Sequence, residues 1–310
     1  MKPSRVLITG GSGFLGNAIA STLLKETAAA VSILDPTLPS ELIAGFGQRV
    51  EHLDITLEEF LSKPEIGRRF DVVVHLTWTT IPASPAKDAE LDVSSNILLS
   101  IRLLHRCGEM GVSRFVFASS GGTVYGPTSH MQVDENFPTN PICAYGISKL
   151  AVEKYASLIG STNGFCSISL RVANPFGHFQ LRGHPIGSIA RFLLAVHQGQ
   201  PITLYGDGSV VRDYLSIDDV ADAFILAINE PGLAAGAYNI GSGIGRSLND
   251  IIRIIAEITD RDTPIVSLPH RPFDVPRIVL DSSRYRHQTG WVARRPLDRE
   301  IINMWRLLNN

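Results

Sequence analysis

Short runs of apolar, mostly β-branched residues alternate with longer segments in which apolar residues recur at helical spacing. The short runs predict strands at residues 5–10, 30–35, 49–54, 70–76, 114–119 and 165–173. The longer segments predict helices at residues 14–26, about 88–110 and 145–160. Strands that alternate with helices form a parallel sheet through right-handed crossovers, so the pattern predicts an α/β fold with a Rossmann-type doubly wound parallel sheet.

The pattern changes after residue 173. A loop-like stretch follows, and glycines and prolines then separate shorter elements. We therefore expect a Rossmann domain at residues 1–173 and a smaller C-terminal α/β substrate domain made mainly of residues 174–310. Some segments of the second part are expected to return to the first domain.

Composition narrows the class of partner. The chain has 310 residues, 44% of them hydrophobic, and a formal net charge of −2, with no lysine- or arginine-rich run. Such a chain can bury a large core, and nothing in it indicates binding to nucleic acid or to an anionic membrane. The apolar runs are too short for a signal peptide or a membrane helix. We expect a cytoplasmic protein that binds a small molecule.

Cysteines and histidines give no sign of a metal site. The three cysteines lack ligand spacing, as expected of reduced packing thiols in a cytosol: Cys107, Cys143 and Cys166. Four histidines likewise match no metal motif: His75, His178, His184 and His270.

A glycine motif follows the first predicted strand. Gly10, Gly13 and Gly16 have the spacing GxxGxxG, which permits a tight turn and a close approach of the backbone to a pyrophosphate at the start of the next helix. Asp35 ends the second strand, where a carboxylate would hold the ribose of NAD and repel the phosphate of NADP. A solvated turn is the alternative for Asp35. Asp54, after the third strand, is expected at the adenine or as a helix N-cap.

A tyrosine and a lysine are spaced one helical turn apart. Tyr145 and Lys149 of "YGISK" would lie on one face of a helix. An ammonium group beside a phenol favours the phenolate, which lowers the tyrosine pKa and makes it a general base.

These motifs give the chain a family resemblance. It resembles the NAD-dependent epimerase/dehydratase group of the extended short-chain dehydrogenase/reductase family, to which UDP-glucose 4-epimerases belong. The resemblance covers nearly the whole chain and rests on segments in family order: "ITGGSGFLG", "SSGGTVYG", "AYGISKLAVE", "LRVANPFG", "LYGDGSVVRDYLSIDDVADA" and "YNIGSG". It implies NAD as cofactor and a nucleoside diphosphate sugar, most simply a UDP-sugar, as substrate.

The resemblance also implies residue roles. Along NAD it places Gly10, Gly13, Phe14, Leu15, Gly16, Asp35, Asp54, Ile55, Leu76, Thr77, Asn96, Tyr145 and Lys149. Tyr145 is then the catalytic base, and Lys149 also holds the nicotinamide ribose. At the sugar diphosphate it places Asn174, Arg212 and Arg271. Structural alternatives are an Arg212–Asp213 surface pair and an Arg271–Asp274 pair.

Which hydroxyl is the catalytic one depends on how the end of the strand at 114–119 is aligned with relatives. Counting forward along the strand "FVFASS" places Ser120 at the catalytic serine of relatives, whereas counting back from "TVYG" places Gly121 there. Because the strand is the rigid element, we predict that Ser120 is catalytic and binds substrate with Tyr145, while Thr123 contacts the sugar. Serines that only satisfy backbone groups at a strand end are the alternative.

Some residues depart from the family pattern. Trp78 of "HLTWTT" stands where relatives often have a small residue and would reshape the pocket near the nicotinamide. Ile278 falls at a position that gates acetamido sugars, so the sugar stays open. Gly121 and Gly122 replace the acidic pair of sugar dehydratases, which disfavours dehydration because elimination needs a proton donor and a base.

The combined prediction is an isomerase that inverts carbon 4 of a UDP-hexose through a transient 4-keto intermediate, with tightly bound NAD. The alternatives are an NDP-4-ketosugar reductase and, in another class, a non-catalytic NAD-sensing protein. Relatives in the family dimerise by packing two helices of each subunit into a four-helix bundle, so the resemblance implies a homodimer through the helices at about 88–110 and 145–160. Helices buried within one subunit are the alternative. The apolar positions concerned are Ile97, Leu98, Ile101, Leu104, Leu150, Tyr155 and Leu158.

Overall fold

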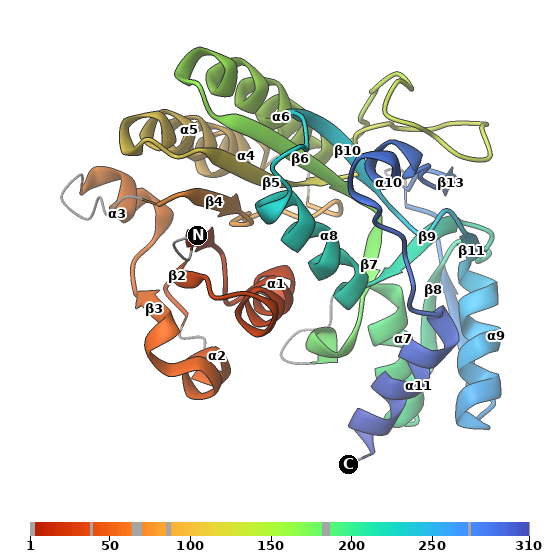
Figure 1. Ribbon diagram of the computed structural model, residues 1–310. Helices are drawn as coiled ribbons and strands as arrows, with labels where there is room; N and C mark the ends of the chain where they lie inside the picture. Colours follow the sequence, from red (N-terminus) through yellow and green to blue (C-terminus); the bar gives the residue numbers. More distant parts are fainter. Residues whose placement is uncertain are drawn as a thin grey trace.

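A seven-stranded parallel sheet organises the molecule in the strand order β10-β6-β5-β4-β1-β2-β3 (Figure 1). The computed structural model describes residues 4–37, 40–63, 70–84, 88–181, 187–271 and 274–309, so His184 lies outside the described residues. The strands of the sheet are β1 (Arg5–Thr9), β2 (Ala30–Leu34), β3 (Val50–Leu53), β4 (Val72–His75), β5 (Arg114–Ser120), β6 (Cys166–Val172) and β10 (Gly236–Ile240). The order of the first six strands is that of the Rossmann fold, which confirms the predicted fold class.

Helices cover both faces of this sheet (Figure 1). On one face α1 (Phe14–Glu26) packs against α8 (Ile217–Asn229), and α2 (Ser40–Phe46) lies beside α1. On the other face α5 (Leu99–Met110) packs between α3 (Leu57–Ser62) and α6 (Ala144–Asn163). Alternate residues of β1 enter the two apolar cores, with Val6 and Ile8 in one and Leu7 in the other, because strand side chains point to opposite faces.

The segment predicted as one helix at 88–110 contains an irregular turn. It consists of α4 (Ala89–Asp92), a π-helical turn at Val93–Leu98 and α5. Asp92 and Asn96 are 1% and 2% exposed and bind the loop after β4. Turns of this kind recur at functional sites, and here the turn directs the Asn96 side chain inward, next to Asp92 at the end of α4.

The C-terminal part of the chain builds a smaller unit beside the sheet (Figure 1). Its strands are β7 (Asn174–Phe176), β8 (Ile202–Tyr205), β9 (Val211–Ser216), β11 (Gly245–Ser247), β12 (Ile265–Leu268) and β13 (Arg277–Ile278). Its helices α7 (Ser188–His197), α9 (Leu248–Thr259) and α11 (Leu297–Leu308) enclose a third apolar core, and η5 is the short turn His178–Leu181. The chain also returns to the large sheet, where β10 forms an edge and α10 (Ser283–Thr289) packs on it.

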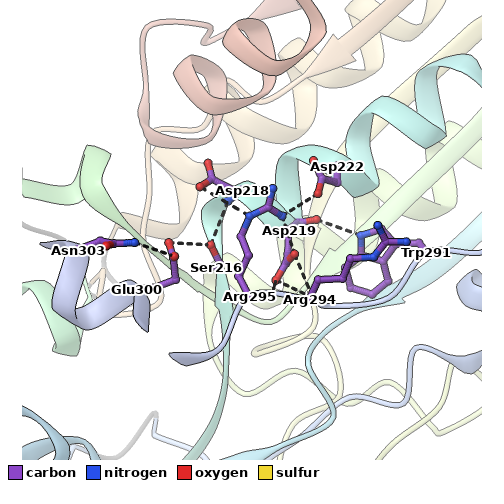
Figure 2. A network of polar contacts seen from close by, with 9 residues as sticks. All are labelled: Ser216, Asp218, Asp219, Asp222, Trp291, Arg294, Arg295, Glu300 and Asn303. Carbon is purple, nitrogen blue, oxygen red and sulfur yellow. Dashed lines mark hydrogen bonds and ion pairs between the residues drawn. The ribbon is translucent and has the colours of Figure 1, made fainter. Parts of the chain in front are cut away.

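A polar network ties the C-terminal segment to α8 (Figure 2). Asp219 is 1% exposed, and its carboxylate accepts the backbone N–H groups of Arg294 and Arg295 at 3.0–3.2 Å. The Arg295 guanidinium donates to Asp219 and Asp222, both at 2.7 Å, and Trp291 Nε1 donates to the Asp219 carbonyl at 3.1 Å. One buried carboxylate therefore fixes the chain that leads into α11 against the helix that covers the large sheet.

Among the described residues there is neither a membrane-spanning helix nor a cluster of metal-ligating side chains. None of the helices in these ranges is long and apolar enough to cross a membrane. Within the same ranges, no group of three or more histidine, cysteine or acidic side chains could hold a metal ion.

Candidate active site

The glycine motif forms a closely packed turn between β1 and α1. A Cβ atom on Gly16 would lie 2.5 Å from the Gly10 carbonyl oxygen, and one on Gly10, whose φ is +70°, would lie 2.8 Å from the Thr77 nitrogen. Gly13 is the N-cap of α1. Among the described residues, no side chain accepts a hydrogen bond from the first N–H groups of this helix, and its first turn contains no aspartate or glutamate. The first N–H groups of α1, on Phe14 and Leu15, are therefore available to an anion such as the pyrophosphate of a dinucleotide, and that contact stays a prediction.

Asp35 lies against this turn. Its Oδ2 accepts from the Ser12 backbone N–H at 3.2 Å and its Oδ1 from the Thr37 N–H at 2.8 Å. The carboxylate is thus held beside the glycine turn, as an aspartate that binds a ribose must be. Asp54 is exposed after β3, and the N-cap of α3 is Thr56 with Glu59. The N-cap alternative for Asp54 is therefore wrong, and the contact of Asp54 and Ile55 with adenine stays a prediction.

The loop after β4 packs on the glycine turn. The backbone N–H groups of Leu76 and Thr77 face Thr9 Oγ1 at 3.3 and 3.4 Å. Asn96 accepts from the Thr79 N–H at 3.0 Å and donates to Asp92 at 2.6 Å. The Asn96 amide thus anchors this loop within the protein, and its predicted contact with the cofactor remains untested.

Tyr145 and Lys149 occupy the first two turns of α6, on one face as predicted. Lys149 is 3% exposed, and its Nζ donates to the Ala118 carbonyl at 2.8 Å. Burial raises the pKa of Tyr145, although a hydrogen bond from Ser120 lowers it, and burial lowers the pKa of Lys149 well below its usual value. The expectation that Lys149 lowers the Tyr145 pKa is therefore wrong for this structure, because burial dominates and the ammonium faces Ala118.

The hydroxyls after β5 have different surroundings. The Ser119 hydroxyl donates to the buried carboxylate of Glu153, whereas the Ser120 hydroxyl lies next to Tyr145 and lowers its pKa. The Thr123 hydroxyl is buried and has no hydrogen-bond partner among the residues that the structure describes. Since a buried hydroxyl without a partner is costly, Thr123 is placed to receive a polar ligand group. Ser120 is thus the hydroxyl beside Tyr145, and its catalytic role stays a prediction.

Two arginines meet at one carboxylate. Arg271 Nε lies 2.9 Å from Asp274 Oδ2, and Arg212 Nη2 lies 3.4 Å from Asp274 Oδ1. Arg271 also covers the Tyr205 ring at 4.3 Å. The Arg271–Asp274 pair therefore exists. The Arg212–Asp213 pair does not form, because the Asp213 carboxylate accepts hydrogen bonds from the backbone N–H groups of Ser242, Gly243 and Leu280. Two guanidiniums around one carboxylate leave a positive charge suited to a diphosphate.

Asn174 and Ile278 line one cavity next to the loop after β5 that is too narrow to hold a water molecule. The other residues around this cavity are Gly122, Ala173, Asp213 and Leu280. Ile278 is 3% exposed in β13, which pairs with β9 beside Arg212. The residue predicted to gate the sugar thus lies next to the polar residues predicted to bind the substrate.

Sequence reasoning missed a buried polar layer behind these residues. Glu153, one turn after Lys149, forms an ion pair with Arg171 of β6 at 2.7 Å, and Asp92 accepts from the Ser148 hydroxyl on α6. Helical spacing places Glu153 one turn from Lys149, which was a usable signal. Asp92 belongs to no motif, and only the fold brings it to α6.

The fold and these residues fit one class of site. A Rossmann sheet carries a glycine turn at the start of α1, and a tyrosine and a lysine lie on one face of α6, which is an arrangement suited to a dinucleotide-dependent enzyme. Residues 6–241 match the NAD dependent epimerase/dehydratase family. The chain belongs to this family, and it is an enzyme of this class.

Curated relatives are similar over most of their length. The chain is 31% identical to a UDP-glucose 4-epimerase of Azospirillum brasilense over 309 residues, covering 94% of this chain and 87% of the relative. It is 31% identical over 295 residues to a dTDP-4-dehydro-6-deoxyglucose reductase of Escherichia coli, with 92% of each chain covered.

Among solved structures, the chain resembles UDP-glucose 4-epimerases. The enzyme of Thermus thermophilus, in complex with NAD, has a TM-score of 0.89 and 31% identity, with 99% of each chain covered. The enzyme of Thermotoga maritima, with UDP-glucose, has a TM-score of 0.90 and 28% identity, covering 99% of this chain and 100% of the other.

Proposed function

We propose that this protein is a nucleotide-sugar 4-epimerase that inverts carbon 4 of a UDP-hexose with tightly bound NAD. The observation that carries the proposal is the grouping of Ser120, Tyr145 and Lys149: the neighbouring Ser120 hydroxyl lowers the pKa of Tyr145, and Lys149 Nζ lies 5.5 Å from the centre of the Tyr145 ring. This group lies at the carboxyl end of the parallel strands, where ligands bind in open α/β sheets. The similarity to UDP-glucose 4-epimerases supports the same reaction.

The cofactor is expected along the glycine turn. Phe14, Leu15 and Gly16 would face the pyrophosphate, Asp35 the ribose, and Tyr145 with Lys149 the nicotinamide end. When bound there, NAD supplies an acceptor that takes hydride from carbon 4 and returns it. The carboxylate of Asp35 disfavours the additional phosphate of NADP.

The protein's own residues handle the proton and the substrate. Tyr145 removes the proton from the sugar 4-hydroxyl, and Ser120 orients that hydroxyl or relays its proton. Thr123, whose hydroxyl has no partner among the described residues, would bind the sugar. Because burial raises the Tyr145 pKa, the phenolate requires a positive charge nearby, which the oxidised nicotinamide of the cofactor would supply.

The substrate diphosphate is expected at Arg212, Arg271 and Asn174. Asp274 forms ion pairs with the guanidinium groups of both Arg212 and Arg271. A bound diphosphate would therefore share these guanidinium groups with Asp274 or replace its carboxylate. Once the 4-keto sugar forms, its rotation in the site presents the other face of carbon 4. The protein's tasks are then to hold the diphosphate, to permit the rotation and to exclude water.

A second candidate is an NDP-4-ketosugar reductase. It is favoured by the 31% identity to the Escherichia coli reductase, which would share the same tyrosine and lysine chemistry. The two candidates differ in cofactor balance, since an epimerase regenerates NAD in each cycle and a reductase consumes reduced cofactor. The test is to incubate the purified chain with UDP-galactose without added cofactor and to measure UDP-glucose. Formation of UDP-glucose supports the epimerase, whereas turnover only with a 4-ketosugar and NADH or NADPH supports the reductase.

We further propose that the protein is a cytoplasmic homodimer. Of the predicted contact residues, Leu98 is 42% exposed on the π-helical turn, while Tyr155 and Leu158 on α6 are 41% and 62% exposed. The others are buried or pack against apolar clusters of the same chain: Ile97, Ile101, Leu104 and Leu150. The exposed residues could therefore form an interface between two copies. The free state of the three cysteines agrees with a reducing compartment.

A further inference from the structure

The indole of Trp78 covers the ammonium group of Lys149. Nζ lies 3.6 Å from the Trp78 ring centroid, against 4.8 Å for Phe117 and 5.5 Å for Tyr145. An ammonium has three N–H donors, and the Ala118 carbonyl accepts one of them. The face of an indole attracts a cation more strongly than the other aromatic rings do, above all away from water. Trp78 is therefore the nearest aromatic partner of a charge that is almost fully buried.

Hydrogen bonds fix the orientation of this indole. Trp78 Nε1 donates to Thr80 Oγ1 at 3.1 Å, and the Thr80 hydroxyl donates to the Asp92 carboxylate. The ring also packs edge-on against Tyr145, with 6.1 Å between centroids and 76° between planes. The indole thus has a polar anchor at its nitrogen and an aromatic contact with the catalytic tyrosine.

The same carboxylate also holds the helix that carries the lysine. Asp92 is 1% exposed and accepts hydrogen bonds from Thr80, Ser148 and Asn96. Ser148 directly precedes Lys149 on α6. Asp92 therefore sets both the position of the indole, through Thr80, and the position of the lysine backbone, through Ser148.

We propose that Trp78 is a positioning residue that holds the Lys149 ammonium between the Ala118 carbonyl and Tyr145, ready for the cofactor. The inference rests on the proposed function, in which Lys149 binds the nicotinamide end of NAD. A lysine side chain is flexible, and ordering it at the moment of binding weakens the binding. A ring that orders the ammonium beforehand removes this cost.

The contact itself is tested by the ring-current shift in the nuclear magnetic resonance spectrum. The full-length chain, freed of bound nucleotide, is labelled with carbon-13 at the lysine side chains, of which the sequence has six. The Lys149 resonance is identified by its loss in Lys149→Arg. We expect its ε-methylene protons to be shifted upfield in the wild type, to lose this shift in Trp78→Leu and to keep part of it in Trp78→Phe. Thr80→Val, which removes the anchor of the indole, should reduce the shift while keeping the ring.

The positioning role is tested by the dissociation constant of NAD, measured by calorimetry on the same proteins. Trp78→Leu should bind NAD about tenfold more weakly than the wild type, and Trp78→Phe should stay within about threefold of it. Trp305→Phe is the matched control, because Trp305 packs in the core of the C-terminal unit near Arg261. It should change neither the Lys149 resonance nor the NAD affinity.

The outcomes are distinguishable. If the Lys149 resonance is the same in Trp78→Leu and the wild type, the indole does not cover the ammonium and the proposal is wrong. It is also wrong if the resonance moves but NAD binds Trp78→Leu as tightly as it binds Trp305→Phe. If the wild type itself does not bind NAD, the proposed function fails, and the resonance of Trp78→Leu still decides whether the contact exists.

Discussion

The buried ion pair between Glu153 and Arg171 predicts a large and specific loss of stability. Three hydrogen bonds of 2.7–3.1 Å join the two side chains, which are 4% and 5% exposed. Glu153 also accepts from Ser119, and Arg171 donates to the Tyr125 hydroxyl. The pair thus joins α6 to β5 and β6, directly behind the end of β5 that carries Ser120.

Glu153→Gln removes the negative charge and leaves the Arg171 charge buried. Breaking a buried pair by removing one partner costs about 3–5 kcal/mol, since the remaining charge is desolvated without compensation. We therefore expect the free energy of unfolding to fall by about 3–5 kcal/mol. The measurement is urea denaturation at pH 7 followed by circular dichroism, with the linear extrapolation to water.

The chain provides a matched control on its surface. Arg253 and Glu257 form an ion pair at 3.7 Å with side chains 64% and 65% exposed, so Glu257→Gln should cost about 1 kcal/mol or less. The double variant Glu153→Leu/Arg171→Met, which removes both charges, should recover part of the loss. The reasoning is refuted if Glu153→Gln loses no more stability than Glu257→Gln.

Three further predictions concern the site and the assembly. Ser120→Ala should lower kcat by about 10²-fold or more, while Thr123→Ala should mainly raise KM. If Thr123→Ala instead loses turnover and Ser120→Ala stays close to the wild type, the two roles are reversed. NAD should bind more than about tenfold tighter than NADP because of Asp35, as calorimetry can measure, and equal dissociation constants would contradict this. Light scattering at micromolar concentration should give a dimer that Leu158→Glu converts to a monomer, whereas a monomeric wild type would reject the interface.

Most strands of the large sheet could be predicted, because each is indicated by a short apolar run within its own stretch of sequence. Runs such as "RVLIT" and "RFVFASS" are apolar on both faces, as expected of buried parallel strands, and their ends fall close to the predicted ones. The strand β10 was not predicted, because "GAYNI" is short and its place beside β6 is set by a distant part of the chain. The π-helical turn was also missed, since its Asn96 binds the loop after β4, which only the fold brings near.

The candidate site was predictable where a motif has a chemical reason. The glycine turn, Asp35 and the Tyr145–Lys149 pair follow from spacing alone, and the structure brings them to one edge of the sheet. The pKa of Tyr145 was predicted with the wrong sign, because spacing gives the distance between two groups but not their burial. The contact of Trp78 with Lys149 depends in the same way on tertiary structure, as it needs the Asp92 carboxylate behind both residues.

The central claim is that carbon 4 loses its hydride and regains the same one within a single active site. The most direct measurement starts from UDP-galactose carrying deuterium at carbon 4 and uses the purified chain without added cofactor. We predict UDP-glucose that retains the deuterium at carbon 4, because the hydride passes to the bound NAD and back without exchange with water. Loss of the label to solvent, or a strict requirement for added reduced cofactor, would contradict the account.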